Sequence, residues 1–456
     1  MIQRVRPFVT YRHRPDHDAS LIIVGSGFAA AAAVTHLAHN DFASSDILII
    51  GPGTLGSGQA YGCNADAFRL NVRADLQRLW PDHPDHFPQW AKTHIEDAQA
   101  KTHAGHFYRR ADFARYISAQ LEAATGKNNL RQVPARVADI RPAQQGWQVL
   151  CDDRTEYHGT SLLLATGNPE PQWPIPNRFK DSSTLIRTPW RGDWLERIDP
   201  TAAICLVGSG LTAMDALSGL AERDHQGPIS LLTPHGILPP EQVGWEPGDP
   251  FLWPDTRRAS DFLHVAFQML RAGFWEEPEW QQRFSALRSG ISTAWQQLPV
   301  EDRMKLQRRA GGLWSLARFR ASPQTVEAAR NMRDRGQLTL IRSALKSLES
   351  TRSDGWQLGL ANEVSLNADA VINCTGVGRD PLIHKLMVTG RLTPLGKSSS
   401  PAVSPGLQVI SEDGSPCDTL FCIGPATALA LGDVMGATSV ATQAAGFARS
   451  LHTVEK

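Results

Sequence analysis

Two glycine patterns of identical spacing could each seat a diphosphate: Gly25-x-Gly27-x-x-Ala30 and Gly208-x-Gly210-x-x-Ala213. Each follows an apolar run and precedes helix-forming sequence. The first glycine permits a tight turn, the second lets the backbone approach a pyrophosphate, and the small third residue lets helix and strand pack closely. The free N–H groups at the start of the helix then face the phosphates. One copy is weak evidence, but two predict two dinucleotide sites.

The residues expected to contact the phosphates follow from these turns. At the first site they are Gly25, Ser26, Gly27, Phe28 and Ala29, and at the second Gly208, Ser209, Gly210, Leu211 and Thr212. After each turn a later apolar strand ends in Thr-Gly, which lets backbone come close to a cofactor. These pairs add Thr166, Gly167, Thr375 and Gly376 to the cofactor-binding candidates, and the end of a C-terminal strand adds Gly424.

The acidic residue that often holds the ribose hydroxyls is absent from both sites. The strand predicted at 46–50 continues into Gly51, and the strand predicted at 229–232 continues into Thr233-Pro234-His235, with no adjacent arginine. The ribose contact of the first cofactor is therefore unassigned, and NADPH is favoured over NADH only by default. His235 could touch a 2′-phosphate, although a lone histidine is more often a surface residue.

Composition narrows the class of protein. The chain has 456 residues and equal numbers of basic and acidic side chains, 46 each, so nothing indicates a nucleic-acid partner. None of the six cysteines forms a C-x-x-C pair, which argues against a zinc ribbon and a redox-active disulfide, and we expect no metal site. Free thiols, the lack of a signal peptide and the lack of a membrane-length apolar run predict a cytoplasmic protein without a membrane partner.

The elements that must position the two turns predict an α/β fold with two doubly wound, Rossmann-like domains. We expect residues 1–175 and 377–456 to form the first domain, and residues 176–376 to form the second, with a helical insert at about 245–330. The insert is rich in Trp and Arg, so it forms either a wall or lid over the substrate or a packed helical subdomain. A helix predicted at 106–125 begins with Arg109 and Arg110, against the helix dipole, which hints at an anionic contact.

With these patterns in view, the chain resembles the flavoproteins that have two dinucleotide-binding domains. It is most similar to the bacterial FAD/NAD(P)-binding group related to class B flavin monooxygenases, which include N-hydroxylases and Baeyer–Villiger enzymes. The segments that carry the resemblance are GSGFAA, AYG, FRLNV, LWPDHPDHFPQW, ATGNP, GSGLTAMD, PHGILP, LWSLARFR and INCTG. The resemblance implies FAD at the first turn and NADPH at the second. It also implies that Tyr61 and Asn71 lie near the isoalloxazine, and that the helix from Ala437 points at the flavin pyrimidine.

The resemblance implies an oxidoreductase that takes NAD(P)H and O2 and inserts one oxygen atom into a small organic substrate through a C4a-(hydro)peroxyflavin. The candidate catalytic residues, for contacts to an anion or to the peroxyflavin, are Asn71, Arg73, Arg318 and Arg320. The same scaffold also suits a flavin-dependent dehydrogenase or oxidase, or a flavin-bound binding protein with little turnover. Substrate identity stays open, and a homo-oligomer is possible.

Overall fold

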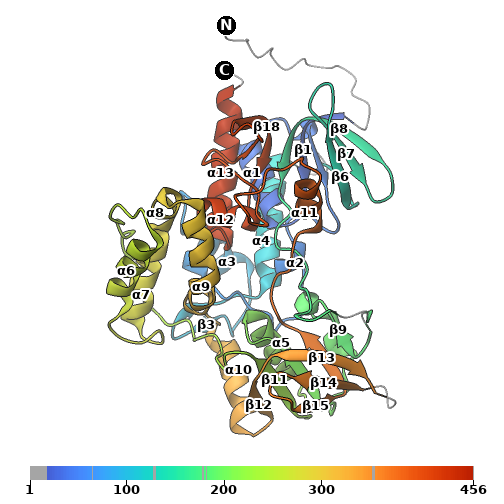
Figure 1. Ribbon diagram of the computed structural model, residues 1–456, viewed down its shortest axis with the longest axis vertical. Coiled ribbons are helices and arrows are strands. Elements are labelled where there is room, and N and C mark those ends of the chain that lie inside the picture. Colours follow the sequence, from blue (N-terminus) through green and yellow to red (C-terminus); the bar gives the residue numbers. More distant parts are fainter. Residues whose placement is uncertain are drawn as a thin grey trace.

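The computed structural model describes residues 18–63, 65–126, 130–176, 179–180, 182–351 and 355–454. The sequence also predicts a polar arm at residues 1–18, and this segment lies outside the described ranges except for Asp18. Figure 1 shows a β-sheet unit at each end of the long axis and a group of helices beside the middle. Within the described ranges, no helix combines the length and the apolar character needed to cross a bilayer.

The first sheet has the strand order β17-β18-β8-β1-β2-β5, and its five strands from β18 to β5 run parallel. Strand β1 is central and almost wholly buried, as its apolar run predicts. The strands are β1 (Asp18–Val24), β2 (Ile47–Ile50), β5 (Arg131–Val133), β8 (Glu156–Leu164), β17 (Gln408–Ile410) and β18 (Pro416–Cys422), with an antiparallel extension of β6 (Val137–Pro142) and β7 (Trp147–Cys151).

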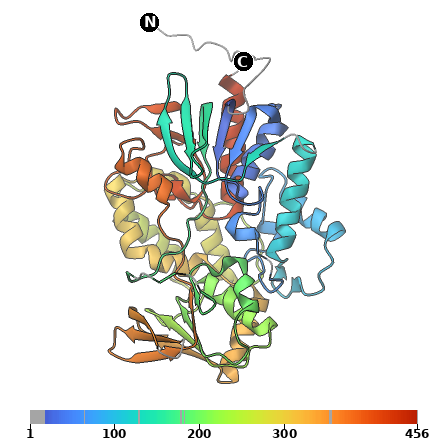
Figure 2. The same ribbon diagram turned by 90° about the vertical axis from the view of Figure 1, so that its right-hand side faces the viewer.

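Helix α1 (Phe28–His39) packs against α13 (Ala437–Val454) and α4 (Arg110–Thr125). Its alanines at 29–33 are buried, and their small side chains let the neighbouring helices approach closely. Figure 2 shows the red C-terminal helix beside the blue N-terminal segment, so both ends of the described chain build one unit. Shorter elements complete it: α2 (Gly58–Tyr61), α3 (His86–His94), β3 (Lys101–Thr102), β4 (Gly105–His106), α11 (Pro381–Val388) and α12 (Ala428–Leu431).

The second sheet repeats the same plan, with the parallel order β12-β11-β10-β16-β9. Strand β10 is central here as β1 is in the first sheet. The strands are β9 (Leu185–Ile186), β10 (Ile204–Val207), β11 (Ile229–Thr233), β12 (Leu338–Arg342) and β16 (Ala370–Asn373), joined by an antiparallel sheet of β13 (Leu345–Ser350), β14 (Trp356–Leu360) and β15 (Ser365–Ala368). Helix α5 (Leu211–Glu222) packs against α10 (Pro323–Asp334).

The helices between β11 and α10 form a subdomain with aromatic clusters of its own. They are α6 (Ala259–Leu270), α7 (Pro278–Ser289), α8 (Ile291–Gln297) and α9 (Val300–Arg318). Trp253 stacks on Phe262 at 4.4 Å between ring centroids. The subdomain docks on the C-terminal segment of the first unit, because Trp295 Nε1 donates to Leu429 O at 2.8 Å and Arg303 Nη1 to Ala430 O at 2.8 Å. The insert therefore extends from the second unit back onto the first.

A buried ion pair joins the two units. Arg110 Nη2, at the start of α4, lies 2.6 Å from Asp215 Oδ2 on α5. Burial raises the pKa of Asp215 to about 6, although the charge of Arg110 and its hydrogen bond act to lower it. The anionic contact suggested for Arg109 and Arg110 is thus made by carboxylates of the chain itself, since Arg109 Nε lies 2.8 Å from Asp112 Oδ2.

Replacing Asp215 by Ala is expected to lower the free energy of unfolding by about 3–5 kcal/mol, because it leaves the Arg110 guanidinium buried without its carboxylate. The double variant Arg110→Met with Asp215→Leu is expected to lose less than the single variant, since no buried charge remains. Urea denaturation followed by tryptophan fluorescence measures both. Equal losses in the two variants would mean that this ion pair does not govern the contact between the units.

Candidate cofactor and active site

The two glycine turns, residues 25–27 and 208–210, have nearly the same backbone geometry. Gly25 has a φ of +117° and Gly208 a φ of +107°, values that favour glycine. Gly27 caps α1 with φ −80° and ψ −165°, and Gly210 caps α5 with φ −76° and ψ −171°. In both turns the first glycine also donates to the end of the neighbouring strand, since Gly25 N lies 2.7 Å from Ile50 O and Gly208 N 2.8 Å from Leu232 O.

Each turn packs tightly on one side and is open on the other. A Cβ on Gly25 would lie 2.3 Å from Ala165 O, and one on Gly208 would lie 2.5 Å from Cys374 O. The Thr-Gly pairs that follow those two residues, predicted to border the cofactors, therefore sit beside the turns. A Cβ on Gly210 would meet nothing within 4 Å, and one on Gly27 would reach only Gly58 Cα at 3.8 Å. The open side of each turn faces the start of a helix, where a diphosphate binds.

The C-terminal segment returns to the first turn. Gly424 follows β18, and a Cβ on it would lie 3.8 Å from the Cβ of Ala29. At the start of α13, one residue after Ala437, Thr438 Oγ1 donates to Leu76 O at 2.7 Å and accepts from Arg78 N at 3.2 Å. The first turn and the start of α13 thus lie at the carboxyl edge of one parallel sheet, which is where open α/β folds bind ligands.

Several buried polar atoms near this edge have no hydrogen-bond partner within the described part of the chain, although buried polar groups in native proteins are usually paired. They belong to α2, to the segment that follows it, to the end of β8 and to the segment before the insert: Gln59 Oε1, Asn71 Oδ1, Arg78 Nε, Asn168 Oδ1 and Trp245 Nε1. An isoalloxazine with its ribityl chain presents N–H, carbonyl and hydroxyl groups that could pair with such atoms. The residues present therefore fit FAD. Tyr61 borders the same region, with its ring 5.9 Å from that of Phe28.

Arg73, a predicted catalytic candidate, already has close protein partners. Its Nε and Nη2 donate to the carboxylate of Asp75 at 3.1 and 2.7 Å, and its Nη1 donates to Trp245 O at 2.7 Å. Its guanidinium also lies 4.9 Å from the centre of the Trp245 ring. These contacts join the first unit to the segment that enters the insert. The side-chain oxygen of Asn71, two residues earlier, has no partner in the ranges that the structure describes.

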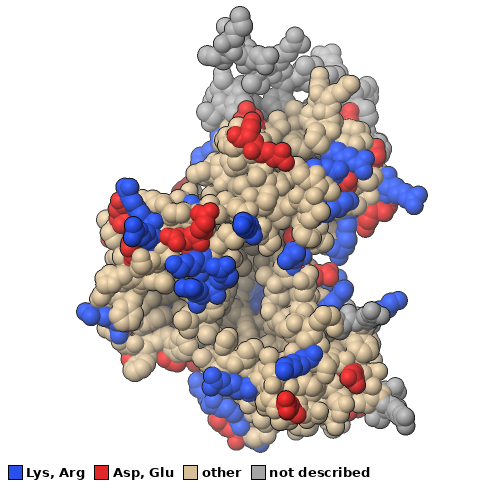
Figure 3. Space-filling view, viewed as in Figure 1, with Lys and Arg blue, Asp and Glu red and all other residues tan. Residues whose placement is uncertain are grey.

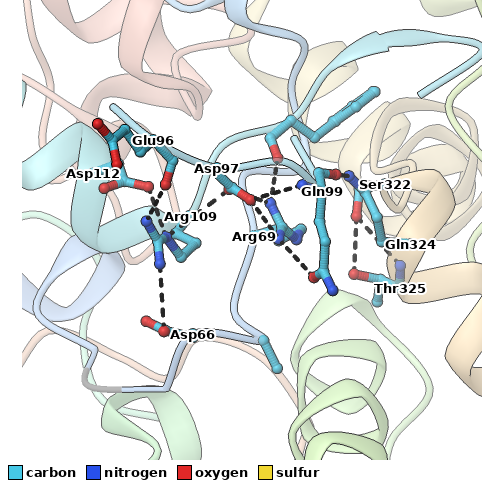
Figure 4. Close-up of polar contacts among 12 residues, drawn as sticks. Asp66, Arg69, Glu96, Asp97, Gln99, Arg109, Asp112, Ser322, Gln324 and Thr325 are labelled. Carbon is cyan, nitrogen blue, oxygen red and sulfur yellow. Dashed lines mark hydrogen bonds and ion pairs between the residues drawn. The ribbon is translucent and has the colours of Figure 1, made fainter. Parts of the chain in front are cut away.

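A polar network that the sequence reasoning missed holds the segment before Asn71 (Figure 4). Arg69 Nη1 donates to Asp97 Oδ2 at 2.7 Å and to Phe107 O at 2.9 Å. Burial acts to raise the pKa of Asp97, but Arg69, Arg109 and an amide N–H together hold it below its usual value. From α10, Gln324 Nε2 donates to Gln99 O at 2.8 Å. In the sequence, only the placement of Arg69 and Arg109 beside apolar residues could have indicated this network.

Arg318, the next candidate, is the last residue of α9 and lies beside the start of α13. Its Nε is 2.5 Å from Asp433 Oδ1, and its Nη2 would lie 3.4 Å from a Cβ on Gly436, the residue before α13. Arg320 is buried two residues later. Figure 3 shows the molecular face hollowed between the helical insert and the two sheet units. The structure therefore brings Arg318 toward the edge that carries the first turn, whereas the second turn lies in the other unit.

No ribose contact could be assigned from the sequence, and the packing at the ends of β2 and β11 explains part of this. A Cβ on Gly51 would lie 2.5 Å from Ser26 N, so this position has no room for an acidic side chain. In the second unit, Ser209 Oγ lies 2.8 Å from both Thr233 Oγ1 and Ile237 O. Arg342, missed in the sequence, is exposed at the end of β12, and its Cδ would lie 3.5 Å from a Cβ on Gly236.

All six cysteines are free thiols, as predicted, and five of them are buried. Burial raises the pKa of Cys151 to about 11 and the pKa values of Cys205 and Cys422 to about 12. Burial also raises the pKa values of Cys63 and Cys374. These thiols stay protonated near neutral pH, and protonated thiols are poor nucleophiles.

Residues 22–169 match the family model described as FAD-NAD(P)-binding. No curated protein matches the chain by sequence. The ornithine hydroxylase of Pseudomonas aeruginosa is 14% identical with a TM-score of 0.65, covering 96% of this chain and 100% of that one. The cadaverine monooxygenase of Erwinia amylovora is 14% identical with a TM-score of 0.63, covering 95% and 94%. The thioredoxin reductase of Lactococcus lactis is 10% identical with a TM-score of 0.53, covering 96% and 99%.

Likeness at these identities establishes the fold. It confirms the predicted α/β architecture, and the family match confirms the predicted FAD/NAD(P) cofactor class. The chain thus carries an FAD/NAD(P)-binding domain at residues 22–169, within a fold similar to those of an ornithine hydroxylase and a thioredoxin reductase.

Proposed function

We propose that this protein is an FAD-dependent monooxygenase that consumes NADPH and transfers one oxygen atom from O2 to a small organic substrate. The observation that carries the proposal is the pair of matched glycine turns on two separate parallel sheets. Two such turns in one chain suit one cofactor that stays bound, FAD, and a second that binds and dissociates in each cycle, NADPH. We also propose that residues 1–175 and 377–456 form the first unit and residues 176–376 the second. These boundaries place all strands of each sheet within one unit.

FAD, when bound, supplies the hydride acceptor and the reaction with O2. The protein residues hold and orient it. We assign the FAD diphosphate to the first turn, and the flavin edge to Asn71, Arg78 and the start of α13. The positive end of that helix favours negative charge on the flavin. The helical insert covers this edge and limits water, which would otherwise compete with the substrate.

The thiols favour O2 over a disulfide as the electron acceptor. A flavoprotein of the disulfide-reductase type needs two neighbouring reactive thiols, whereas the cysteines of this chain are free and mostly buried. A dehydrogenase or oxidase remains the second candidate, because the same scaffold would serve it.

The proposal is tested with purified protein that contains FAD, mixed with NADPH in air. The solved structures of similar fold include hydroxylases of ornithine and cadaverine, so primary diamines and basic amino acids are the first substrates to try. Consumption of NADPH that rises with one of these compounds, together with a mass gain of one oxygen in the product, is expected. Rapid flavin reduction that yields only hydrogen peroxide with every compound would favour the oxidase, and no reduction would favour a binding protein.

Arg342 is expected to select NADPH over NADH. It ends β12 beside Gly236, in the loop that follows β11, where the 2′-phosphate of NADPH lies in such folds. Among the described residues no carboxylate forms an ion pair with it. Arg342→Gln should raise the KM for NADPH about 10- to 100-fold, the effect of losing a charged hydrogen bond, and leave the KM for NADH unchanged.

Arg335→Gln is the matched control, because Arg335 is an exposed arginine that precedes β12 and so lies at the opposite edge of the same sheet. Steady-state flavin reduction with each nucleotide measures both variants. Equal losses with NADPH and NADH in Arg342→Gln would remove this residue from the 2′-phosphate site.

A further inference from the structure

The Arg320 guanidinium is buried, and no carboxylate in the described part of the chain pairs with it. The residue is 6% exposed, and its Nε donates to Ala317 O at 3.2 Å. Its guanidinium lies 5.3 Å from the centre of the Phe284 ring. Its Nη2 is buried, and neither Nη atom has a hydrogen-bond partner among the residues that the structure describes. Burying a charged group in this way destabilises the folded protein unless a ligand or another residue pairs with it.

Two more arginines raise the positive charge at this place. Arg318 Nε and Arg288 Nη1 share the carboxylate of Asp433, at 2.5 and 3.1 Å. Burial, together with the charges of Arg288 and Arg318, lowers the pKa of Arg320 to about 9. We call Arg288, Arg318, Arg320 and Asp433 the arginine cluster. Among the described residues, Asp433 is the one carboxylate that pairs with any of these three cations. The cluster therefore carries an excess of positive charge and is largely buried.

The arginine cluster borders the proposed flavin edge. Asp433 lies in the loop between α12 and α13, and Arg318 Nη2 would lie 3.4 Å from a Cβ on Gly436. Two residues further, Thr438 bonds to the backbone at Leu76 and Arg78. Arg288 comes from α7 and Arg318 from α9, so the insert supplies the cations. A ligand held there would lie between the insert and the flavin edge.

We propose that the arginine cluster binds a carboxylate group of the substrate, with Arg320 as its principal donor. The two Nη atoms of a guanidinium match the two oxygens of a carboxylate in a bidentate pair. This inference rests on the proposed function and adds to it the class of substrate, a small molecule that bears a carboxylate. Phosphate offers similar oxygen acceptors and is the competing ligand in the test.

The alternative is that Arg320 serves only to stack on Phe284. The two roles differ in what removal of the charge does to the ligand-free protein. An arginine that only stabilises the fold lowers the melting temperature when it is replaced. An arginine kept for a ligand is itself destabilising, so Arg320→Met, which still packs on the ring, should leave the melting temperature unchanged or raise it.

The binding test uses the FAD-loaded protein and pairs of probes that differ in one carboxylate. These are lysine against cadaverine and ornithine against putrescine, with benzoate against benzamide for a ligand without an amine and inorganic phosphate as the competitor. Flavin difference spectra give each affinity. The wild-type protein should prefer the carboxylate member of at least one pair by about 10- to 100-fold. Arg320→Met should lose that preference, and Arg320→Lys should keep part of it.

Arg308→Gln is the matched control, because Arg308 is an exposed arginine of α9, the helix that ends two residues before Arg320. It should keep the preference of the wild type. The proposal is overturned if no pair shows a preference, if Arg320→Met keeps it, or if phosphate binds more tightly than every carboxylate. Failure of NADPH to reduce the flavin would count against the proposed function instead, because carboxylate binding is measured on the oxidised flavin.

Discussion

Gly210→Asp is expected to abolish reduction of the flavin by NADPH while FAD stays bound. A Cβ at this position meets nothing within 4 Å, so the fold accommodates the new side chain. Gly210 caps α5 without a side-chain hydrogen bond, and Asp is a preferred residue at that position, so the helix should gain stability. On the proposed assignment, however, the new carboxylate faces the NADPH diphosphate, and like charges placed together cost several kcal/mol.

The expected rise in the KM for NADPH is therefore about 100-fold or more. Stopped-flow reduction of the flavin and the ratio of flavin to protein measure the two halves of this expectation. Gly210→Ala is the control, since it adds the Cβ without the charge and should reduce the flavin nearly as the wild type does. Loss of FAD from Gly210→Asp, or unchanged reduction, would contradict the assignment of the second turn.

Gly27→Asp is expected to have the opposite pattern and to yield a folded protein without FAD. Gly27 caps α1 with almost the same φ and ψ as Gly210 caps α5, and a Cβ on it would reach only Gly58 Cα, at 3.8 Å. The aspartate again suits the helix start and repels the diphosphate. The purified variant should be colourless, and its affinity for added FAD should fall about 100-fold or more.

Circular dichroism separates this loss from a failure to fold, and Gly27→Ala is the uncharged control. The two aspartate variants together test the assignment of one cofactor to each turn. If Gly27→Asp purifies with as much FAD as the wild type, the first turn does not hold that diphosphate.

The parts of the site that follow from local sequence were predictable. The spacing of Gly25 and Gly27 requires a turn between an apolar strand and a helix, and the structure shows this turn twice. The similar segments Ala165-Thr166-Gly167 and Cys374-Thr375-Gly376 also occupy equivalent positions in the structure. Each segment packs against the first glycine of a turn. Small residues beside a tight turn leave a pattern that a single sequence displays.

Contacts between distant segments left no such pattern. The pairing of β12 with β11 brings Arg342 to Gly236, and nothing near either residue indicates it. The partner of Arg110 is Asp215, on a helix of the other unit. The sequence singles out Arg320 as a candidate, but only the structure shows that it is buried beside two other arginines and that no described carboxylate pairs with it.

Element ends differed from the sequence expectation where short strands intervene. The helix predicted at 106–125 begins at Arg110, because residues 105–106 pair with β3 and Arg109 is extended. Apolar residues recur at helical spacing within this range, at Phe113, Tyr116, Ile117 and Leu121, and all four are buried in the helix. Periodicity thus located the body of the helix, whereas its start depends on a two-residue strand too short to leave a periodic signal.

The most direct test of the account is anaerobic mixing of the FAD-containing protein with NADPH while the flavin absorbance is followed. If the two turns hold FAD and NADPH with their reactive rings within hydride reach, the yellow colour bleaches at a rate that saturates with NADPH. NADPH deuterated at the transferred position then slows that rate. A flavin that stays oxidised at saturating NADPH and NADH, or a purified protein that neither contains nor binds FAD, would contradict the account.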